Sequence, residues 1–510
     1  HRLGLVLRRI SGAVAGAGLV IAIIWLASSD RGVRAQEMWV GATPVTLYQS
    51  TSPTADAPLV VISHGFAGSQ LLMKPFAVTL ARAGYAAVTF DYLGHGRNRK
   101  PLRGDITKVE GATQRLLDQT RVIVDEMMAK LGTSRRLAII GHSMASDIVV
   151  RYAKTDSRVE ATIAVSMFSP AVTADAPSNL LILVGGLESG LIQEAKRVLR
   201  LRTEEPQAHR TYGDFASGTA RRLALAPYRE HLGVLYEPSG LRETRAWLDE
   251  VFDRESSAPV DDRGGAILLL FACMGILGWP IFASLPRVSD PAPQPPSSWR
   301  SIAIAAAAPA LVTPVVLMSF PPDFLSVLVG GYLAVHFGVY GVITWVTTRF
   351  VLRLPAPRPL LRAKHALWLT VAAMFATAYA AGAVALAMDW AFTSFAMMPP
   401  RWPLFAIMTA GTSAYFLADA SLTTGAHAPR GAWLFTRGAF LASLGLAVAL
   451  SFDELFFLLI IAILIVPYFL VYGMWSRWVF QATGHPAVGA LASAVAFAWT
   501  IAVVFPMLAG

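Results

Sequence analysis

The sequence predicts a chain with two parts of different class: an α/β domain on a doubly wound, mostly parallel sheet, and an all-α polytopic membrane domain. Three observations carry this prediction. Residues 36–256 alternate short apolar runs with helical patterns, which is typical of parallel α/β sheets. Residues 264–510 are dominated by long apolar runs. The 510-residue chain is 55% hydrophobic and 15% charged, too apolar for an ordinary soluble protein.

The N-terminal stretch, residues 1–35, reads as a signal anchor. Arg2, Arg8 and Arg9 precede an apolar run over 12–28, which is just long enough to span a bilayer. A basic leader before an apolar run fits a signal anchor or a cleaved signal peptide. Val33-Arg34-Ala35 is a candidate cleavage site, but charged residues crowd it, so we favour an uncleaved anchor. Either way, the following domain is expected outside the cytoplasm.

The α/β domain is assigned to residues 36–256, and its elements follow one another as strand and helix. The apolar runs predict strands at 58–63, 86–91, 137–140, 159–166, 179–185 and 219–226. The amphipathic patterns predict helices at 70–84, 108–131, directly after residue 143, 191–202 and 240–253. In such sheets the ligand site lies beyond the carboxyl ends of the strands.

The membrane domain is assigned to residues 257–510, after a polar linker at Arg254–Asp262. Most of its apolar runs reach the ~20 residues that a spanning helix needs. About eight spans are expected, at 264–286, 301–320, 323–348, 365–388, 403–422, 432–451, 455–474 and 487–508.

The charges between the spans predict the topology. With the N-terminus in the cytoplasm, the cytoplasmic ends carry Arg287, Arg300, Arg349, Arg353, Arg358, Arg362, Lys364, Arg430, Arg437 and Arg477. The other side carries Asp323, Asp389, Asp453 and Glu454, with Arg401 as the exception. This positive-inside bias predicts a multi-pass protein of the cell (inner) membrane, with residues 36–256 in the periplasm or its equivalent. It also explains the net charge of +10, so no nucleic-acid partner is expected.

The stretch that carries the chemistry runs from residue 137 to 145. Leu137-Ala138-Ile139-Ile140 suits a buried strand, and Gly141-His142-Ser143-Met144-Ala145 follows before an apolar-periodic helix. Strand, Gly-x-Ser-x-small turn and helix together form a nucleophile elbow. Small residues are needed two before and two after the serine because strand and helix nearly touch there. Ser143 is therefore the predicted nucleophile.

A serine nucleophile needs a base to take its proton and an acid to hold that base. Glu188 is the first carboxylate after the strand that ends near Val184, and Asp175 is its weaker rival. His231 follows the last strand, and His209 is the second choice for the base. In folds that carry a nucleophile elbow, the nucleophile, the acid and the base follow one another along the chain in this order, as Ser143, Glu188 and His231 do here.

The oxyanion hole is expected in the turn Ser63-His64-Gly65-Phe66-Ala67-Gly68-Ser69, which follows the first strand of the domain. The expected donors are the Phe66 N–H and the Met144 N–H at the start of the elbow helix. The loss of one such donor costs roughly 3 kcal/mol of transition-state stabilisation. This chemistry calls for no metal and no cofactor.

These motifs together resemble the α/β-hydrolase superfamily, nearest to its dienelactone-hydrolase-like and serine-aminopeptidase-like members. The resemblance covers residues 58–256 and includes Asp91-Tyr92-Leu93-Gly94-His95-Gly96 and Gly185-Gly186-Leu187-Glu188. It implies a Ser-His-acid mechanism through an acyl-enzyme. Ala145 departs from the common glycine, and Glu188 stands where aspartate is commoner. Only about a dozen residues separate the strand at 159–166 from the next one, so a short or open lid replaces the large cap of many members.

The leading interpretation is therefore a membrane-bound serine hydrolase that cleaves an ester, thioester or amide. A small-molecule or lipid-like acyl substrate and the lipid bilayer are its expected partners. One alternative is a polytopic transporter or lipid-handling protein with an accessory hydrolase-like domain. Another is an acyltransferase that uses the same triad.

The membrane domain resembles no family that its residues identify. Its intramembrane ionisable residues His336, Asp419 and Arg437 are functional candidates. Asp419 and Arg437 are placed to pair across adjacent helices. Snorkelling of Arg437 and a hydrogen-bonded packing role for His336 are the favoured interpretations.

Overall fold

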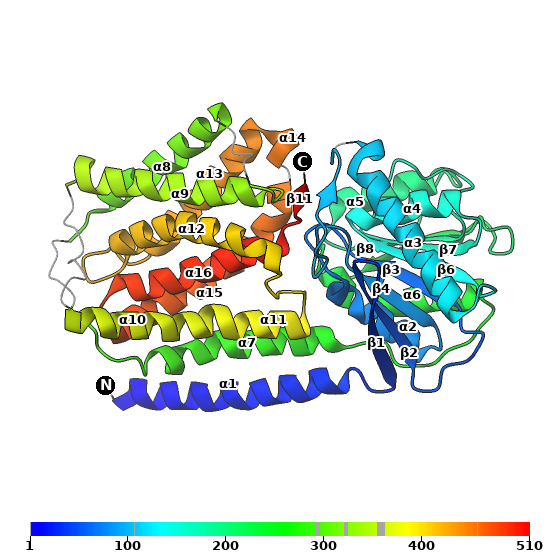
Figure 1. Ribbon diagram of the computed structural model, residues 1–510, viewed down its shortest axis with the longest axis horizontal. Helices are drawn as coiled ribbons and strands as arrows, with labels where there is room; N and C mark the ends of the chain where they lie inside the picture. The colour runs from blue at the N-terminus through cyan, green and yellow to red at the C-terminus, as the bar shows by residue number, and fades with distance from the viewer. Residues whose placement is uncertain are drawn as a thin grey trace. The chain divides into compact units, whose positions relative to one another are not determined.

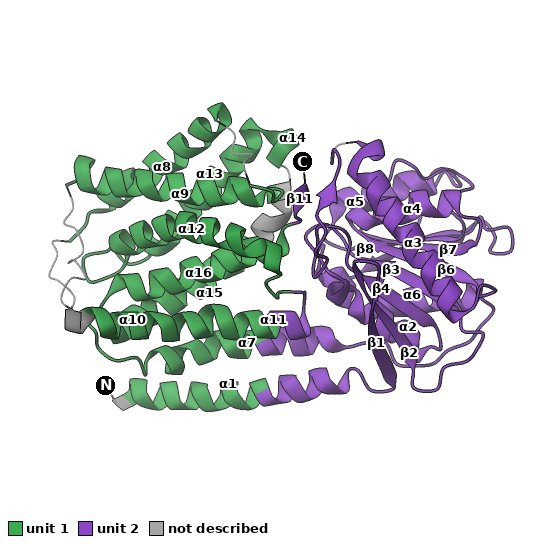
Figure 2. Ribbon diagram, viewed as in Figure 1, with its two compact units in different colours: residues 1–19, 271–387, 395–505 green, residues 20–270, 388–394, 506–510 purple. Residues whose placement is uncertain are grey.

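The computed structural model describes residues 2–106, 108–290, 296–320, 325–353, 363–455 and 457–509. The chain divides into two compact units (Figure 2). The sheet unit comprises residues 20–270, 388–394 and 506–510, and the helical unit comprises residues 1–19, 271–387 and 395–505. The expected topology residues Asp323, Arg358 and Arg362 lie outside the described residues.

The sheet unit is built on nine strands in the order β1-β2-β4-β3-β6-β7-β8-β10-β9 (Figure 1). Their bounds are Val33–Val40 (β1), Thr43–Ser50 (β2), Leu59–Ser63 (β3), Ala86–Phe90 (β4), Leu137–His142 (β6), Val159–Val165 (β7), Leu180–Gly185 (β8), Thr211–Tyr212 (β9) and Arg221–Ala226 (β10). The six strands from β4 to β10 in this order run parallel. The predicted doubly wound, mostly parallel sheet is confirmed.

Helices cover both faces of this sheet because its strands are apolar on both sides. Leu137 and Ile139 of β6 pack with α3 (Gln114–Leu131) and α4 (Met144–Thr155). Ala138 and Ile140, which alternate with them, pack on the opposite face with α2 (Lys74–Arg82) and α6 (Pro238–Val251). α5 (Ser189–Leu199) joins α4 in a further cluster. Period-two alternation of the strand side chains therefore divides the core between the two faces.

The hairpin of β1 and β2 is not among the predicted strands. β1 is exposed along most of its length and pairs antiparallel with β2, with Val40 opposite Thr43. An edge strand of this kind is held by backbone hydrogen bonds, so its sequence lacks the apolar run that marks the central strands.

Two predicted helices differ at their ends. The helix expected at 70–84 starts as a 3-10 turn over Gln70–Met73 and ends at Arg82. The helix expected at 108–131 becomes regular only at Gln114, after a π turn over Val109–Thr113. Gly111 has a non-helical backbone there, with φ −91° and ψ −118°. Helical periodicity does not register such an interruption.

The sheet unit also contains two short segments from the far end of the chain, residues 388–394 and 506–510. β11 (Leu508–Ala509) pairs in parallel with β5 (Leu102–Arg103). The Met507 N–H donates to the Gly94 carbonyl at 2.9 Å, and the Leu102 N–H donates to the Met507 carbonyl at 2.8 Å. Residues 507–509 thus form backbone hydrogen bonds with the loop that follows β4.

Ion pairs hold the C-terminal end of one apolar helix and the N-terminal end of another within the sheet unit. α1 (Arg2–Ser28) is followed by Asp30, and α7 (Arg263–Phe282) begins with Arg263. Asp30 contacts Lys74 at 2.6 Å and Arg263 at 2.9 Å. Because these bonds lie within residues 20–270, the α1 and α7 ends belong to the same compact unit as the sheet.

The helices after α7 are α8 (Trp299–Ser319), α9 (Gly330–Val346), α10 (Ala363–Thr377), α11 (Val384–Ala391), α12 (Trp402–Thr423), α13 (Ala432–Leu450), α14 (Phe452–Leu455), α15 (Phe457–Thr483) and α16 (Pro486–Val504). Six described stretches are long and apolar enough to cross a membrane: 3–28, 263–282, 299–319, 366–391, 432–450 and 486–504. These helices suggest a multi-pass membrane protein. The other expected spans, 323–348, 403–422 and 455–474, overlap α9, α12 and α15.

Candidate active site

Ser143 lies at the tip of a sharp turn between β6 and α4. Its backbone has φ 54° and ψ −118°, a strained conformation for a residue with a side chain. Gly141 permits the turn, because a Cβ there would fall 2.7 Å from the carbonyl carbon of Ala145. The Ser143 N–H donates to the Val165 carbonyl at 2.8 Å, which holds the turn against the neighbouring strand.

Ser143, His231 and Glu188 form one hydrogen-bonded series. The Ser143 Oγ lies 2.8 Å from His231 Nε2, and His231 Nδ1 lies 2.6 Å from Glu188 Oε1. The Glu188 side chain is 8% exposed and that of His231 23%. An ionised carboxylate only accepts hydrogen bonds, so Nδ1 carries the proton and Nε2 is left to accept from the Ser143 hydroxyl.

The second oxygen of Glu188 is held by two donors. Oε2 accepts from Ser166 Oγ and from the Gly185 N–H, both at 2.7 Å. A Cβ on Gly185 would fall 2.9 Å from Oε2, so the glycine leaves room for the carboxylate. Ser166 is not among the predicted site residues, although its place at the end of the strand before the Glu188 strand was a usable signal.

The rival residues lie in other surroundings. The Asp175 side chain is 82% exposed and is paired with Arg202. The His209 side chain is 50% exposed and contacts Glu243 at 3.4 Å. The structure therefore brings Glu188 and His231, and not these two residues, into the series with Ser143.

The turn after β3 lies directly beside Ser143. A Cβ on Gly65 would fall 2.9 Å from the Ser143 Cβ and 3.0 Å from His142 Nδ1. This turn carries the Phe66 amide, and Met144 is the first residue of α4. The first N–H groups of a helix have no partner within the helix. Both expected oxyanion donors thus belong to segments that adjoin Ser143.

Two buried histidines support the turn and the base. His64 accepts from the Tyr92 N–H at Nε2, over 3.0 Å, so its Nδ1 donates to the Gly65 carbonyl at 2.8 Å. His142 Nε2 donates to the His231 carbonyl at 3.0 Å. Burial lowers the pKa of His64 and, with repulsion from His231, lowers the pKa of His142 well below 6.5. Both rings are therefore neutral supports.

A comparison with protein families supports the class of this unit. Residues 54–220 match the family model "Serine aminopeptidase, S33". The match and the sheet support an α/β hydrolase for this part of the chain. No curated protein was found to match the chain.

Solved structures of α/β hydrolases resemble the chain over less than half of its length. "Methylesterase BT1017" is 18% identical at TM-score 0.32, over 43% of this chain and 54% of its own, so this chain spans about half of it. A membrane phospholipase A, titled a novel bacterial virulence factor, is 16% identical at TM-score 0.31, over 49% and 98%. Dienelactone hydrolase from Anabaena variabilis is 17% identical at TM-score 0.31, over 44% and 98%.

The end of the turn in this α/β-hydrolase unit is tied to the segment 388–394. The Ser69 hydroxyl, which is buried, lies 3.0 Å from Thr393 Oγ1 and accepts from the Ser394 N–H at 2.9 Å. The next N–H, that of Gln70, donates to Asp91 at 2.7 Å. Burial raises the pKa of Asp91, and the carboxyl also accepts from the Arg97 N–H. No sequence pattern indicates the contact with residue 393.

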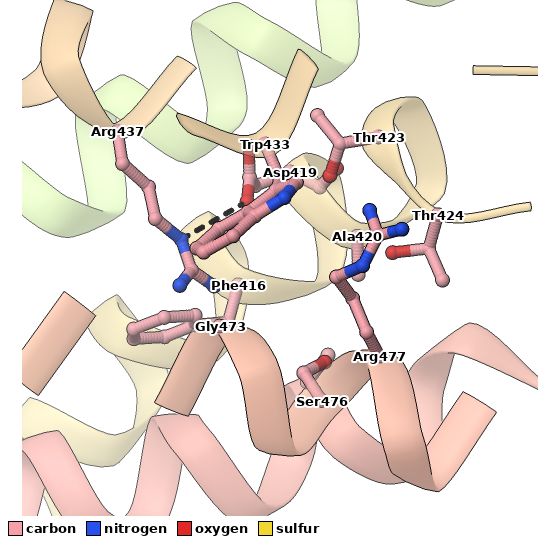
Figure 3. A pocket seen from close by; sticks show the side chains of 11 residues that line it. Phe416, Asp419, Ala420, Thr423, Thr424, Trp433, Arg437, Gly473, Ser476 and Arg477 are labelled. Carbon is pink, nitrogen blue, oxygen red and sulfur yellow. Dashed lines mark hydrogen bonds and ion pairs between the residues drawn. The ribbon is translucent and has the colours of Figure 1, made fainter. Parts of the chain in front are cut away.

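The helical unit contains a separate polar cluster, which Figure 3 shows at the wall of a pocket. Asp419 lies 3.8 Å from Arg437 Nε and accepts from the Thr436 hydroxyl at 2.6 Å. Arg437 also donates to the Phe469 carbonyl. The pairing expected of Asp419 and Arg437 is thus present. His336 contacts the Ser443 hydroxyl at 3.1 Å, in keeping with its packing interpretation.

Proposed function

We propose that the sheet unit is a serine hydrolase that cleaves an ester, thioester or amide through an acyl-enzyme. The observation that carries this proposal is the series Ser143–His231–Glu188, with hydrogen bonds of 2.8 and 2.6 Å. The series has the order and the polarity that nucleophilic catalysis by serine needs. Amides are included among the substrates because the matched family is named for a serine aminopeptidase.

The steps follow from the positions of the atoms. His231 Nε2 takes the proton of Ser143 as the Oγ bonds to the acyl carbon, and Glu188 stabilises the imidazolium through Nδ1–H. The N–H groups of Phe66 and Met144 donate to the oxyanion. His231 then protonates the leaving group as its bond to the acyl carbon breaks, which leaves the acyl-enzyme. A water molecule, deprotonated by His231, attacks the acyl carbon, the bond to Ser143 Oγ breaks, and His231 returns the proton to Oγ as the acid leaves.

The proposal is tested by labelling the full-length protein with a fluorophosphonate, which reacts with activated serines. Wild type is expected to be labelled, and Ser143→Ala is expected to be unlabelled. Asp175→Asn and His209→Gln serve as controls, because these residues contact Arg202 and Glu243 instead of the series, and both should label as wild type does. Labelling of Ser143→Ala, or no labelling of wild type, would show that Ser143 is not the nucleophile.

We further propose that the protein is a multi-pass protein of the cell membrane with the sheet unit on the extracytoplasmic side. The positive-inside bias of the loops supports this orientation. In a Cys273→Ser background, a cysteine introduced at exposed Asp56 should react with an impermeant maleimide in intact cells. One introduced at Asp290, whose side chain is 96% exposed, should react only after permeabilisation. The reverse pattern would invert the topology.

A further inference from the structure

Three apolar side chains near the Ser143–His231–Glu188 series are unusually exposed. Phe168 is 64% exposed, Leu187 64% and Tyr228 86%. Among the described residues from 29 to 262, these are the three most exposed large apolar side chains, and the next is Trp39 at 57%. We call these three residues the apolar rim.

All three members of the rim follow the carboxyl ends of neighbouring parallel strands. Phe168 follows β7, Leu187 follows β8 and Tyr228 follows β10, and these strands are adjacent in the sheet. The carboxyl edge of such a sheet is where ligands bind. The rim therefore lies at the functional edge, whereas Trp39 lies on the edge strand β1.

The rim is also adjacent to the hydrogen-bonded series in the chain. Leu187 directly precedes Glu188, and Tyr228 lies in the loop that leads to His231. Phe168 follows Ser166, whose hydroxyl donates to Glu188. Each rim residue thus shares a loop with the acid, with the base or with a donor to the acid.

The backbone of the rim is held in place. The Leu187 N–H donates to the Arg229 carbonyl at 3.0 Å, and the Gly186 N–H donates to the Ala226 carbonyl at 2.8 Å. The Phe168 N–H donates to Ser146 Oγ at 3.2 Å, and Ser146 belongs to α4. Tyr228 has φ +56°, a left-handed conformation that a bulky residue adopts only under constraint. The side chains are therefore presented to solvent by an ordered backbone.

The connection between β7 and β8 contains no helix. Every residue of 166–179 is described, and none of them lies in a helix or strand. Apolar side chains left in water gain free energy when an apolar group covers them. The rim residues share their loops with Glu188 and His231, which are hydrogen-bonded in series with Ser143, so a substrate bound at Ser143 is the covering group that this placement favours.

We propose that the apolar rim binds the hydrocarbon chain of an amphiphilic substrate whose acyl carbon is attacked by Ser143. This inference rests on the proposed serine hydrolase function and names its substrate class. The hydrocarbon chain of the substrate packs on Phe168, Leu187 and Tyr228. The carbonyl group of the substrate lies between Ser143 and the turn at Gly65. Each methylene covered by the rim then adds to binding.

The experiment compares the rates at which an ethyl and an octyl fluorophosphonate label Ser143 in the full-length protein, in nanodiscs and below the micellar concentration of either probe. Wild type should react faster with the octyl probe, by about ten-fold. The variant Phe168→Ser, Leu187→Ser, Tyr228→Asn should lose most of this ratio. Asparagine is chosen at 228 because it tolerates a positive φ.

The matched control is Val122→Ser, which removes a 52% exposed apolar side chain from α3 and should keep the wild-type ratio. An octyl-to-ethyl ratio in the rim variant equal to that of wild type overturns this inference. If turnover of vesicle-bound lipid falls in that variant while the ratio is unchanged, the rim binds the membrane surface and not the substrate. Loss of all labelling in wild type overturns the proposed function as well. Thermal unfolding of the variant shows whether it is folded.

Discussion

Ser69 and Thr393 lie 324 positions apart in the chain, and their hydroxyls are 3.0 Å apart in the sheet unit. Ser69 ends the turn that passes beside Ser143, and Thr393 belongs to a segment that follows α11. The turn that is proposed to supply an oxyanion donor is thus fixed by a residue from the apolar half of the chain.

The substitution Ser69→Ala tests this contact. The substitution removes the hydrogen-bond partner of the Ser394 N–H and of the Thr393 hydroxyl. Both residues are only 8% exposed, and a buried group that loses its partner lowers the stability by about 1–3 kcal/mol. We expect a lower thermal midpoint and slower labelling of Ser143. Ser52→Ala, in an exposed loop, is the control, and equal midpoints for the two variants would mean that the contact does not stabilise the protein.

Glu188→Gln should lower kcat strongly with little change in the amount of folded protein. The amide cannot stabilise the imidazolium of His231 as a carboxylate does, and such a change in a triad costs about 10⁴-fold in kcat. Steady-state hydrolysis of an ester or amide that wild type cleaves provides the measurement. Asp175→Asn should retain wild-type kcat, and the assignment of the acid fails if the two variants are reversed.

Stability should fall as the pH drops below about 6.5. Burial lowers the pKa values of His142 and His64, so the unfolded chain binds protons there that the folded chain excludes. Above pH 6.5 both rings are neutral in the folded and the unfolded chain, so they do not change the stability. Below pH 6.5 the free energy of unfolding falls by up to about 1.4 kcal/mol per pH unit for each ring. Thermal midpoints between pH 5 and 8 measure this slope.

His142→Gln should flatten that slope while keeping a donor for the His231 carbonyl. His64 remains in this variant, so part of the slope should persist. A slope equal to that of wild type would contradict the proposed neutral state of His142.

Substitutions of Asp419 and Arg437 should have non-additive effects on thermal stability, because the two side chains form an ion pair. Both side chains are nearly buried, at 6% and 7% exposed, and removal of one partner from a buried pair costs about 3–5 kcal/mol. Asp419→Ala and Arg437→Met should each lower the thermal midpoint clearly. The double variant should recover part of the loss, whereas additive losses would show that the two charges do not interact.

The signals that predict the site are local in the sequence. Gly141 and Ala145 mark the turn by their size, since a side chain at 141 would collide with the backbone of residue 145. Glu188 and His231 each follow an apolar strand, and the parallel register brings the ends of those strands to one edge. Ser166 was missed because its place at a strand end indicates a role only when it is combined with the pairing of β7 and β8.

The sequence by itself determined the α/β class, because periodicity is written in consecutive residues. It predicted the elbow at Ser143, and Glu188 and His231 as its partners, from residues that directly follow apolar strands. Only the tertiary structure decided that residues 388–394 and 506–510 complete the sheet unit, that β1 and β2 extend its edge, and that Phe168, Leu187 and Tyr228 are left exposed. These features depend on contacts between distant residues and on solvent exposure, which a run of neighbouring residues does not specify.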